Sequence, residues 1–152
     1  MKNTTLIILI LFLYSCGYSS IYKNQTSQNF KINIIEKKGN SEMNNLIKNE
    51  IKLYSVKNTT NIYNLKIDTD YKKEILTKNS AGIITDYKLS VTSIFRVDLK
   101  GVTKVIELKE TINIKNQSDS FEQNTYEKNI KRSFASSIRE KLILEILNIN
   151  DN

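Results

Sequence analysis

The chain has 152 residues, with 23 Lys and Arg against 16 Asp and Glu, one Cys, and no His or Trp. This length has room for one domain, and the missing residues exclude catalysis by imidazole, Ser-His-Asp triads, zinc sites built from Cys and His, and an intramolecular disulfide. The formal charge of +7 is carried mostly by Lys residues spread through every segment. Nucleic-acid-binding proteins instead cluster Arg and aromatic side chains. We therefore predict that the lysines form a solvated surface and that nucleic acid is not a partner.

The first fifteen residues have the pattern of a lipoprotein signal peptide. Lys2 precedes an uninterrupted apolar run over residues 6–13. As a helix this run would span about 12 Å, too little for a hydrocarbon core of about 30 Å, so we interpret it as the apolar region of a secretory signal. The run ends in Leu13-Tyr14-Ser15-Cys16. A large aliphatic residue three positions before a Cys, with a small residue directly before it, is the bacterial lipoprotein cleavage pattern.

Cys16 is therefore the predicted lipid-attachment site, and residues 1–15 are the predicted signal peptide. The alternative is an ordinary buried cysteine that follows an apolar run, and it is disfavoured because the only Cys stands where cleavage requires it. Two or more acyl chains would anchor the protein stably through its N-terminus. In many Gram-negative bacteria an Asp after the Cys retains a lipoprotein at the inner membrane, and Gly17 stands there instead. We therefore expect a lipid-anchored protein on the periplasmic side of the outer membrane.

Residues 16–29 are polar and are predicted to form a lipidated N-terminus and tether, followed by a single α+β domain over residues 30–149. Alternating residues over 30–34 predict a strand that ends near Glu36, followed by a turn. Apolar residues at helical spacing then predict a helix over about residues 41–54, capped by Asn40 or Ser41. The apolar stripe of this helix consists of Met43, Leu46, Ile47, Ile51 and Tyr54.

Three extended segments follow. Residues 61–77 alternate, and so do residues 83–99, where most apolar residues fall on odd positions and most polar residues on even ones. At about 3.3 Å per residue the second segment would span about 56 Å, which is longer than a typical strand, so we expect a bulge, a bend or a projecting end. Lys100-Gly101 predicts a tight hairpin turn, and residues 102–114 a return strand.

The last element is predicted to be a long helix over about residues 124–148, after a loop at residues 116–120. Asn124 followed by Glu127 resembles a capping box at the start of this helix. Its apolar residues recur at every fourth position: Tyr126, Ile130, Phe134, Ile138, Leu142 and Ile146.

The element order is β-α-β-β-β-α, and each strand has one apolar and one polar face. This order predicts an α+β fold, a two-layer sandwich with a four-stranded, mostly antiparallel sheet and two helices on one face. The opposite face of the sheet would be polar and would meet water or a partner.

Little in the sequence supports catalysis. The few glycines do not form a phosphate-binding loop. Asp68 and Asp70 share the polar face of one strand and could in principle do acid–base work, but a solvated strand face is the favoured interpretation. We expect no enzyme activity, no metal and no cofactor.

The start of the mature chain resembles a known family. Cys16-Gly17-Tyr18-Ser19-Ser20-Ile21-Tyr22 is similar to the Cys-Gly-aromatic-x-Pro-Leu-Tyr start of alphaproteobacterial lipopolysaccharide (LPS)-assembly lipoproteins, the LptE family. The order of elements resembles that family over the full mature length. The resemblance implies a non-enzymatic protein that sits in the LPS-assembly β-barrel, LptD, helps it fold, and binds LPS during delivery to the cell surface.

Strand face and charge alone indicate the candidate LPS-contacting residues, because the resemblance does not identify them. Lys88 and Arg96 are expected on the outward face of the long strand, and Lys100 and Lys104 at its hairpin. Cationic side chains would meet LPS phosphates, Arg in bidentate fashion. The alternative function is an accessory lipoprotein of an ABC-type lipid transport system, which would dock on a periplasmic shuttle. A generic ligand-binding lipoprotein is disfavoured because two helices already occupy the apolar sheet face.

Overall fold

The computed structural model of the protein describes residues 30–53, 59, 61–99 and 101–150. The predictions for Cys16, for the signal peptide and tether, for Tyr54 and for Lys100 therefore lie outside the described residues.

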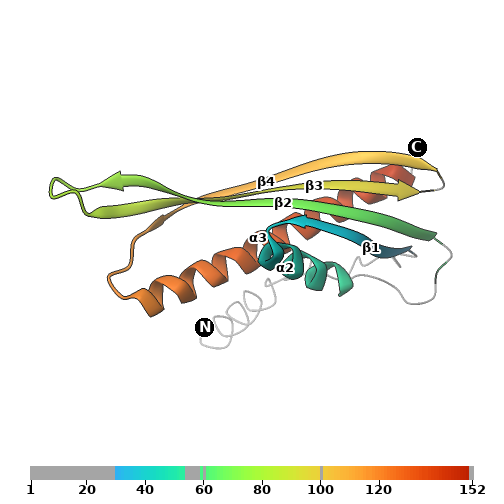
Figure 1. Cartoon of the computed structure of the whole chain (residues 1–152). Coiled ribbons are helices and arrows are strands. Elements are labelled where there is room, and N and C mark those ends of the chain that lie inside the picture. Colours follow the sequence, from blue (N-terminus) through green and yellow to red (C-terminus); the bar gives the residue numbers. More distant parts are fainter. Residues whose placement is uncertain (1–29, 54–58, 60, 100, 151–152) are drawn as a thin grey trace, which may run out of the picture.

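The described chain forms a two-layer α+β sandwich, and the predicted element order is confirmed (Figure 1). The elements are β1 (Phe30–Gly39), α2 (Ser41–Lys52), β2 (Asn61–Lys78), β3 (Ile84–Leu99), β4 (Val102–Lys115) and α3 (Ser120–Asn150).

The four strands are neighbours in chain order, β1-β2-β3-β4. β2, β3 and β4 pair antiparallel through hairpins, whereas β1 pairs parallel to β2 with Phe30 opposite Asn61. A parallel pair requires a crossover connection, and α2 provides it. The sheet is therefore mixed and mostly antiparallel, as predicted.

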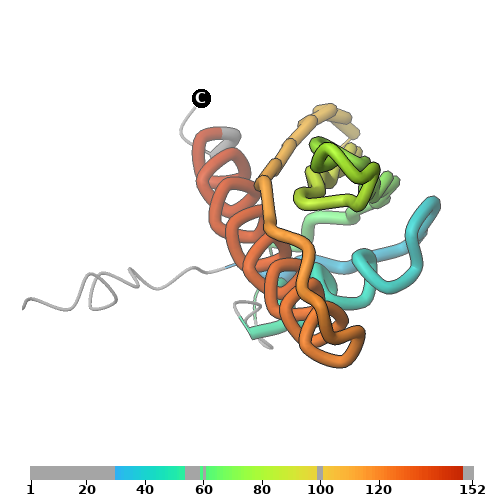
Figure 2. Tube along the Cα trace, turned by 90° about the vertical axis from the view of Figure 1, so that its left-hand side faces the viewer, coloured from blue at the N-terminus to red at the C-terminus, as the bar shows by residue number. Residues whose placement is uncertain are grey.

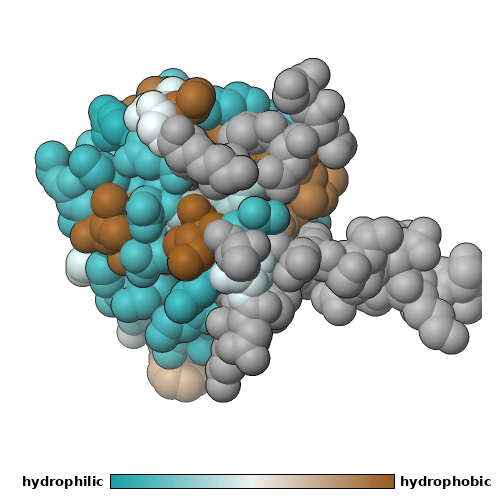
Figure 3. Space-filling view, turned by 90° about the vertical axis from the view of Figure 1, so that its right-hand side faces the viewer, coloured by the Kyte–Doolittle hydropathy of each residue, from teal (hydrophilic) through white to brown (hydrophobic). Residues whose placement is uncertain are grey.

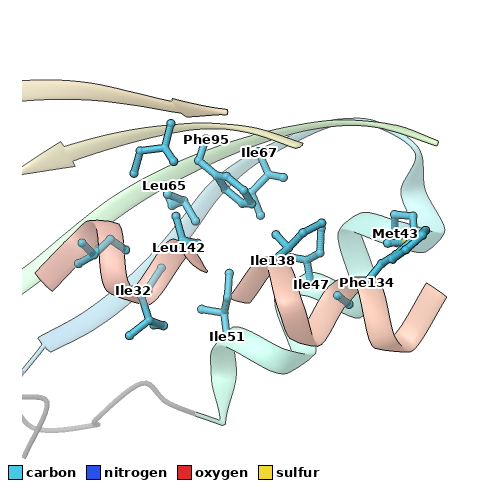
Figure 4. Close-up of a cluster of buried hydrophobic side chains, with 14 of the residues drawn as sticks. Ile32, Met43, Ile47, Ile51, Leu65, Ile67, Phe95, Phe134, Ile138 and Leu142 are labelled. Atoms are coloured by element: carbon cyan, nitrogen blue, oxygen red, sulfur yellow. The ribbon is translucent and has the colours of Figure 1, made fainter. Parts of the chain in front are cut away.

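Both helices pack on one face of the sheet and enclose a single core (Figures 2 and 4). Seen from one end in Figure 2, α3 lies to one side of the strands. The helices also pack against each other. Figure 4 labels side chains that meet between the layers: Ile32, Leu65, Ile67 and Phe95 from the strands, Met43, Ile47 and Ile51 from α2, and Phe134, Ile138 and Leu142 from α3.

Over the body of the sheet, the alternation along the strands predicted correctly which residues face the core. The odd-numbered residues of β3 from Leu89 to Val97 are all buried, and so are those of β2 from Tyr63 to Thr69. Two of these positions are polar, and the hydroxyls of Thr69 and Ser93 satisfy each other at 3.1 Å inside the core. The even-numbered residues of both strands lie on the opposite face.

The junction between β1 and α2 depends on backbone packing. Gly39 has a φ of 76°, and a Cβ added there would lie 2.1 Å from the carbonyl oxygen of Thr69. Only glycine fits this close approach. The next residue, Asn40, caps α2 as predicted, because its Oδ1 accepts a hydrogen bond from the backbone N–H of Met43 at 2.9 Å.

The predicted start of the last helix is wrong by one turn. α3 begins at Ser120, and Asp119 caps it by accepting from the backbone N–H of Glu122 at 2.8 Å. Asn124 lies inside the helix and is exposed. The spacing of Asn124 and Glu127 matches a capping box, but Asp119 and Glu122 have the same spacing five residues earlier and form the actual cap.

At the N-terminal end of α3, the residues of the four-residue apolar repeat are no longer buried in the core. Residues from Phe134 to Ile146 at this spacing are buried, but Tyr126 is 39% exposed. A helix turns about 100° per residue, so a repeat of four drifts about 40° at each step. The core therefore shifts onto neighbouring positions, and Ala135, Arg139 and Ile143 are buried as well.

The expected projecting end of the long strands is present. Every residue from Lys72 to Ile83 is exposed, and the end of the β2–β3 hairpin, residues 75–85, extends past the start of α3 (Figure 1). We call residues 75–85 the arm. The β2–β3 register shifts at Ile75/Thr77 and again at Thr77/Lys78. Ile83, expected on the core face, is instead 61% exposed, because no helix reaches it.

Candidate functional site

The candidate site lies on the face of the sheet that the helices leave uncovered, which we call the outer face. The even-numbered residues of β2 and β3 meet there across an antiparallel register, and one such pair is Lys66 with Arg96. On β1, a bulge between Ile34 and Glu36 brings Glu36 opposite Lys66. Because the register is fixed by hydrogen bonds along the whole sheet, these side chains form one row across three strands.

A depression of about 240 Å³ lies around this row. Its lining residues are Glu36, Lys38, Lys66, Ile67, Asp68 and Arg96. The cations of this set outnumber its carboxylates. Within the described residues Arg96 forms no ion pair, and its side chain is exposed.

The charges in the depression are coupled to one another. Lys38 donates to Glu36 at 3.0 Å, and the ammonium of Lys66 lies 3.8 Å from the other oxygen of Glu36. The hydrogen bond and charge of Lys38, followed by the charges of Lys66 and Arg96, lower the pKa of the Glu36 carboxyl. Glu36 therefore stays ionised at neutral pH and holds the two lysines beside the free guanidinium of Arg96.

This arrangement can bind an anionic group. A guanidinium offers paired donors that match a phosphate or carboxylate, and a nearby ammonium adds charge. The rest of the outer face carries both cations and anions, and the ammonium of Lys72, for example, lies 3.1 Å from the carboxylate of Asp70. The face as a whole therefore suits a polar partner of mixed charge, with a local positive excess at Arg96.

The four predicted LPS-contacting residues do not form one cluster. Arg96 and Lys88 both lie on the outer face, but eight residues of one strand separate them by roughly 26 Å. Lys104 pairs with the inward residue Val97 and therefore lies on the helix-covered face, where its ammonium is 3.2 Å from Glu145 of α3. Lys100 lies outside the described residues.

Sequence reasoning missed Lys38 and Lys66 as neighbours of Arg96. Both stand at polar positions of predicted strands or turns, but their meeting depends on the strand register and on the bulge in β1. Asp68 also belongs to the depression, whereas Asp70 is paired with Lys72. The two aspartates considered for acid–base work thus both have cationic neighbours.

Two further statements hold for the described part of the chain, residues 30–53, 59, 61–99 and 101–150. Its helices include none long and apolar enough to cross a membrane. Its carboxylates include no group of three that could hold a metal ion.

No protein-family model matches the chain, and no curated protein matches it in sequence. Solved structures do share its fold. The crystal structure of rare lipoprotein B from Shewanella oneidensis matches with a TM-score of 0.57 at 15% identity, over 78% of this chain and 99% of that one. A protein from Caulobacter crescentus CB15, described as a lipoprotein, matches with a TM-score of 0.56 at 8% identity, over 81% and 90% of the two chains. At such identities the likeness shows a common fold.

Proposed function

We propose that this protein is a bacterial outer-membrane lipoprotein that partners an LPS-assembly β-barrel and assists LPS insertion at the cell surface, without catalysing a reaction. The observation that carries the proposal is the combination of a lipoprotein cleavage pattern ending at Cys16 with a fold shared by solved bacterial lipoproteins. The resemblance of the mature N-terminus to the LptE family supplies the assignment to LPS assembly.

The outer face supports the partner assignment. Its strands are long and free of helices, and they carry cations and anions interspersed with neutral side chains, including the exposed Ile62 and Val105. A polar surface of mixed charge is compatible with the wet lumen of a barrel, since each charge can meet an opposite charge or water. The apolar face of the sheet, in contrast, is covered by α2 and α3.

The depression at Arg96 supports direct contact with LPS. Its guanidinium is free of ion pairs within the described residues, and Lys66 and Lys38 stand beside it. LPS carries phosphates, which a guanidinium can engage in bidentate fashion. We therefore assign Arg96, with Lys66 as its neighbour, as the primary contact, and Lys88 as a separate one.

Native copurification tests the partner. The acylated protein is purified from native membranes by affinity, and the proteins that follow it are identified by mass spectrometry. A stoichiometric large β-barrel supports the proposal. An inner-membrane transporter or a periplasmic lipid shuttle would instead support an accessory role in ABC-type lipid transport.

Replacing Cys16 by Ala tests the anchor. The variant is expected to remain a precursor that is absent from the outer membrane, because no thiol is left to take the diacylglycerol. Fractionation followed by immunoblotting measures this. Normal outer-membrane sorting of the Cys16→Ala protein would rule out lipidation at this residue.

Charge reversal at the depression tests LPS contact. Arg96→Glu is expected to weaken LPS binding roughly tenfold or more, with a smaller loss at high salt. Arg132→Glu is the matched control, since it makes the same charge change on an exposed position of α3. Equal affinities of the two variants in a direct binding assay would remove the depression as the contact.

A further inference from the structure

Asp68 is the carboxylate of the depression that has no partner among the described residues. The other carboxylate, Glu36, is held by Lys38 and Lys66. Asp68 is half-buried, and with the residues that the structure describes it forms neither an ion pair nor a hydrogen bond. The depression therefore combines an unpaired carboxylate with the unpaired guanidinium of Arg96.

The sheet register makes Asp68 and Arg96 diagonal neighbours on the outer face. Arg96 lies opposite Lys66, and Asp68 lies two residues further along β2, opposite Ile94. Diagonal positions of an antiparallel pair are roughly 7–8 Å apart. The guanidinium and the carboxylate are therefore close enough for one small ligand to reach both.

The surroundings of Asp68 explain why it stays unpaired. On β1, Lys38 lies opposite Asp68, but its ammonium is 3.0 Å from Glu36. Gly39 has no side chain, and a Cβ added there would lie 3.1 Å from Oδ1 of Asp68. The carboxylate thus lies beside bare backbone, and the lysine opposite it is engaged by Glu36.

The lining of the depression is charged and offers little apolar surface. Ile67 is the only apolar residue of the lining, and its side chain is buried in the core (Figure 4). Figure 3 shows the end of the molecule away from the arm, where hydrophobic residues also form only small separate areas among hydrophilic ones. A ligand in the depression would therefore be held through its charged groups.

Asp68 disfavours an anion alone and favours a ligand that also carries a cation. Its carboxylate would repel a phosphate bound at Arg96. The same carboxylate accepts strong hydrogen bonds from a primary ammonium, whereas the guanidinium matches a phosphate. The two side chains together fit a ligand whose opposite charges lie close to each other.

We propose that the depression recognises a phosphate and a primary ammonium joined by a short linker, as in a phosphoethanolamine group. Arg96 holds the phosphate, and Asp68 holds the ammonium. The inference rests on the proposed function, because it uses the same anion contact at Arg96, and it specifies the chemical group that binds there.

Two ligands of the same shape test the proposal on the unchanged protein. Phosphoethanolamine ends in an ammonium where propyl phosphate ends in a methyl group. Each is titrated against the full mature protein in non-ionic detergent micelles, and phosphorus NMR measures the dissociation constant. We expect phosphoethanolamine to bind roughly threefold or more tightly. The cations of the depression by themselves would favour propyl phosphate, because it carries the larger negative charge.

Two variants assign the preference to a residue. Asp68→Asn keeps the shape of the side chain and removes its charge, so the preference should disappear or reverse. Asp70→Asn is the matched control and should keep the preference, because Asp70 lies on the same face of β2, outside the depression, and pairs with Lys72 at 3.1 Å. A preference that survives Asp68→Asn would overturn the proposal.

The two ligands also separate this inference from the proposed function. If propyl phosphate binds to the unchanged protein as tightly as phosphoethanolamine or more tightly, the ammonium contact is wrong and the anion contact at Arg96 stands. If neither ligand binds, both contacts are wrong.

Competition identifies the molecule that carries the group, either as a phospholipid headgroup or as a substituent of a glycolipid such as LPS. Micelles containing phosphatidylethanolamine are compared with micelles containing phosphatidylglycerol, and LPS bearing phosphoethanolamine is compared with LPS lacking it. Stronger displacement of the soluble ligand by the amine-bearing member of one pair supports the proposal and identifies that source. Equal displacement within both pairs would overturn the proposal.

Discussion

At the scale of single residues, Gly39 connects the sheet to the helix layer. The backbone of β1 approaches β2 so closely there that a Cβ would overlap the carbonyl of Thr69. We expect Gly39→Ala to lower the free energy of unfolding by at least about 3 kcal/mol, because both the left-handed backbone and the overlap penalise alanine. Chemical denaturation measures the change.

Gly82→Ala is the matched control. Gly82 has nearly the same φ, 78°, but nothing lies within 4 Å of its added Cβ. Gly82→Ala is expected to lower the free energy of unfolding by about 1 kcal/mol, because only the left-handed backbone conformation penalises alanine there. If both variants lose the same amount, the close approach at Gly39 contributes nothing.

The side chain of Tyr71 is half-buried, and its ring lies 4.7 Å from the ammonium of Lys131. Its hydroxyl is enclosed and makes no hydrogen bond within the described residues. Tyr71→Phe is therefore expected to leave the stability unchanged or to raise it by about 1 kcal/mol, because an unsatisfied hydroxyl is removed. A clear loss of stability would show that the hydroxyl has a partner in solution.

The same substitution has a pH signature. Burial, and then the charges of Glu127 and Glu42, raise the pKa of Tyr71 to about 12, against about 10 in the unfolded chain. The folded state therefore keeps a proton that the unfolded state loses, and this contribution to stability is present below pH 10 and disappears as the pH rises to about 12. Between pH 10 and about pH 12 the parent protein should therefore lose stability relative to Tyr71→Phe, which has no group at this position that titrates. A constant difference would contradict the raised pKa.

At the scale of elements, α3 is held by the residues that face α2 and the sheet. Phe134 is 6% exposed in the core, whereas Phe121 is 78% exposed in the first turn of the same helix. Phe134→Ala is expected to destabilise the protein by roughly 3–5 kcal/mol and Phe121→Ala by less than about 0.5 kcal/mol. Thermal and chemical unfolding compare the two. Equal effects would mean that α3 is not packed as described.

The same element shows what a sequence pattern can and cannot predict. The spacing of apolar residues predicted a long helix correctly, because periodicity is a local property of the chain. It placed Tyr126 on the core side, where the structure has it exposed. Which part of a drifting stripe is buried depends on where the sheet lies beneath the helix, and that is a tertiary property.

At the scale of the whole molecule, the domain divides into a packed body and an exposed arm. Amides of the arm are expected to exchange with solvent more readily than those of β2 and β3 beneath the helices, at an opening free energy roughly 3 kcal/mol or more below global unfolding. Native-state hydrogen exchange measures this residue by residue. Equal protection of arm and body would mean that something covers the arm in solution.

The candidate site could be predicted only in part. Alternation alone placed Arg96 and Lys88 on the outer face, and the structure agrees. Their separation along one strand also follows from the sequence. The neighbours of Arg96 did not, because Lys66 reaches it through the β2–β3 register and Glu36 through a bulge in β1. The ion pair of Lys104 with Glu145 likewise required the position of α3.

The sequence by itself determined the kinds of elements, their order, and the face of each strand that carries apolar side chains. It also identified Cys16 as the lipid-attachment prediction, which lies outside the described residues. Tertiary structure alone decided the parallel pairing of β1, the cluster around Arg96 and which residues of the β2–β3 hairpin lie beyond the helices. The physical reason is that alternation and helical period act over a few residues, whereas register, helix placement and burial depend on contacts between segments far apart in the chain.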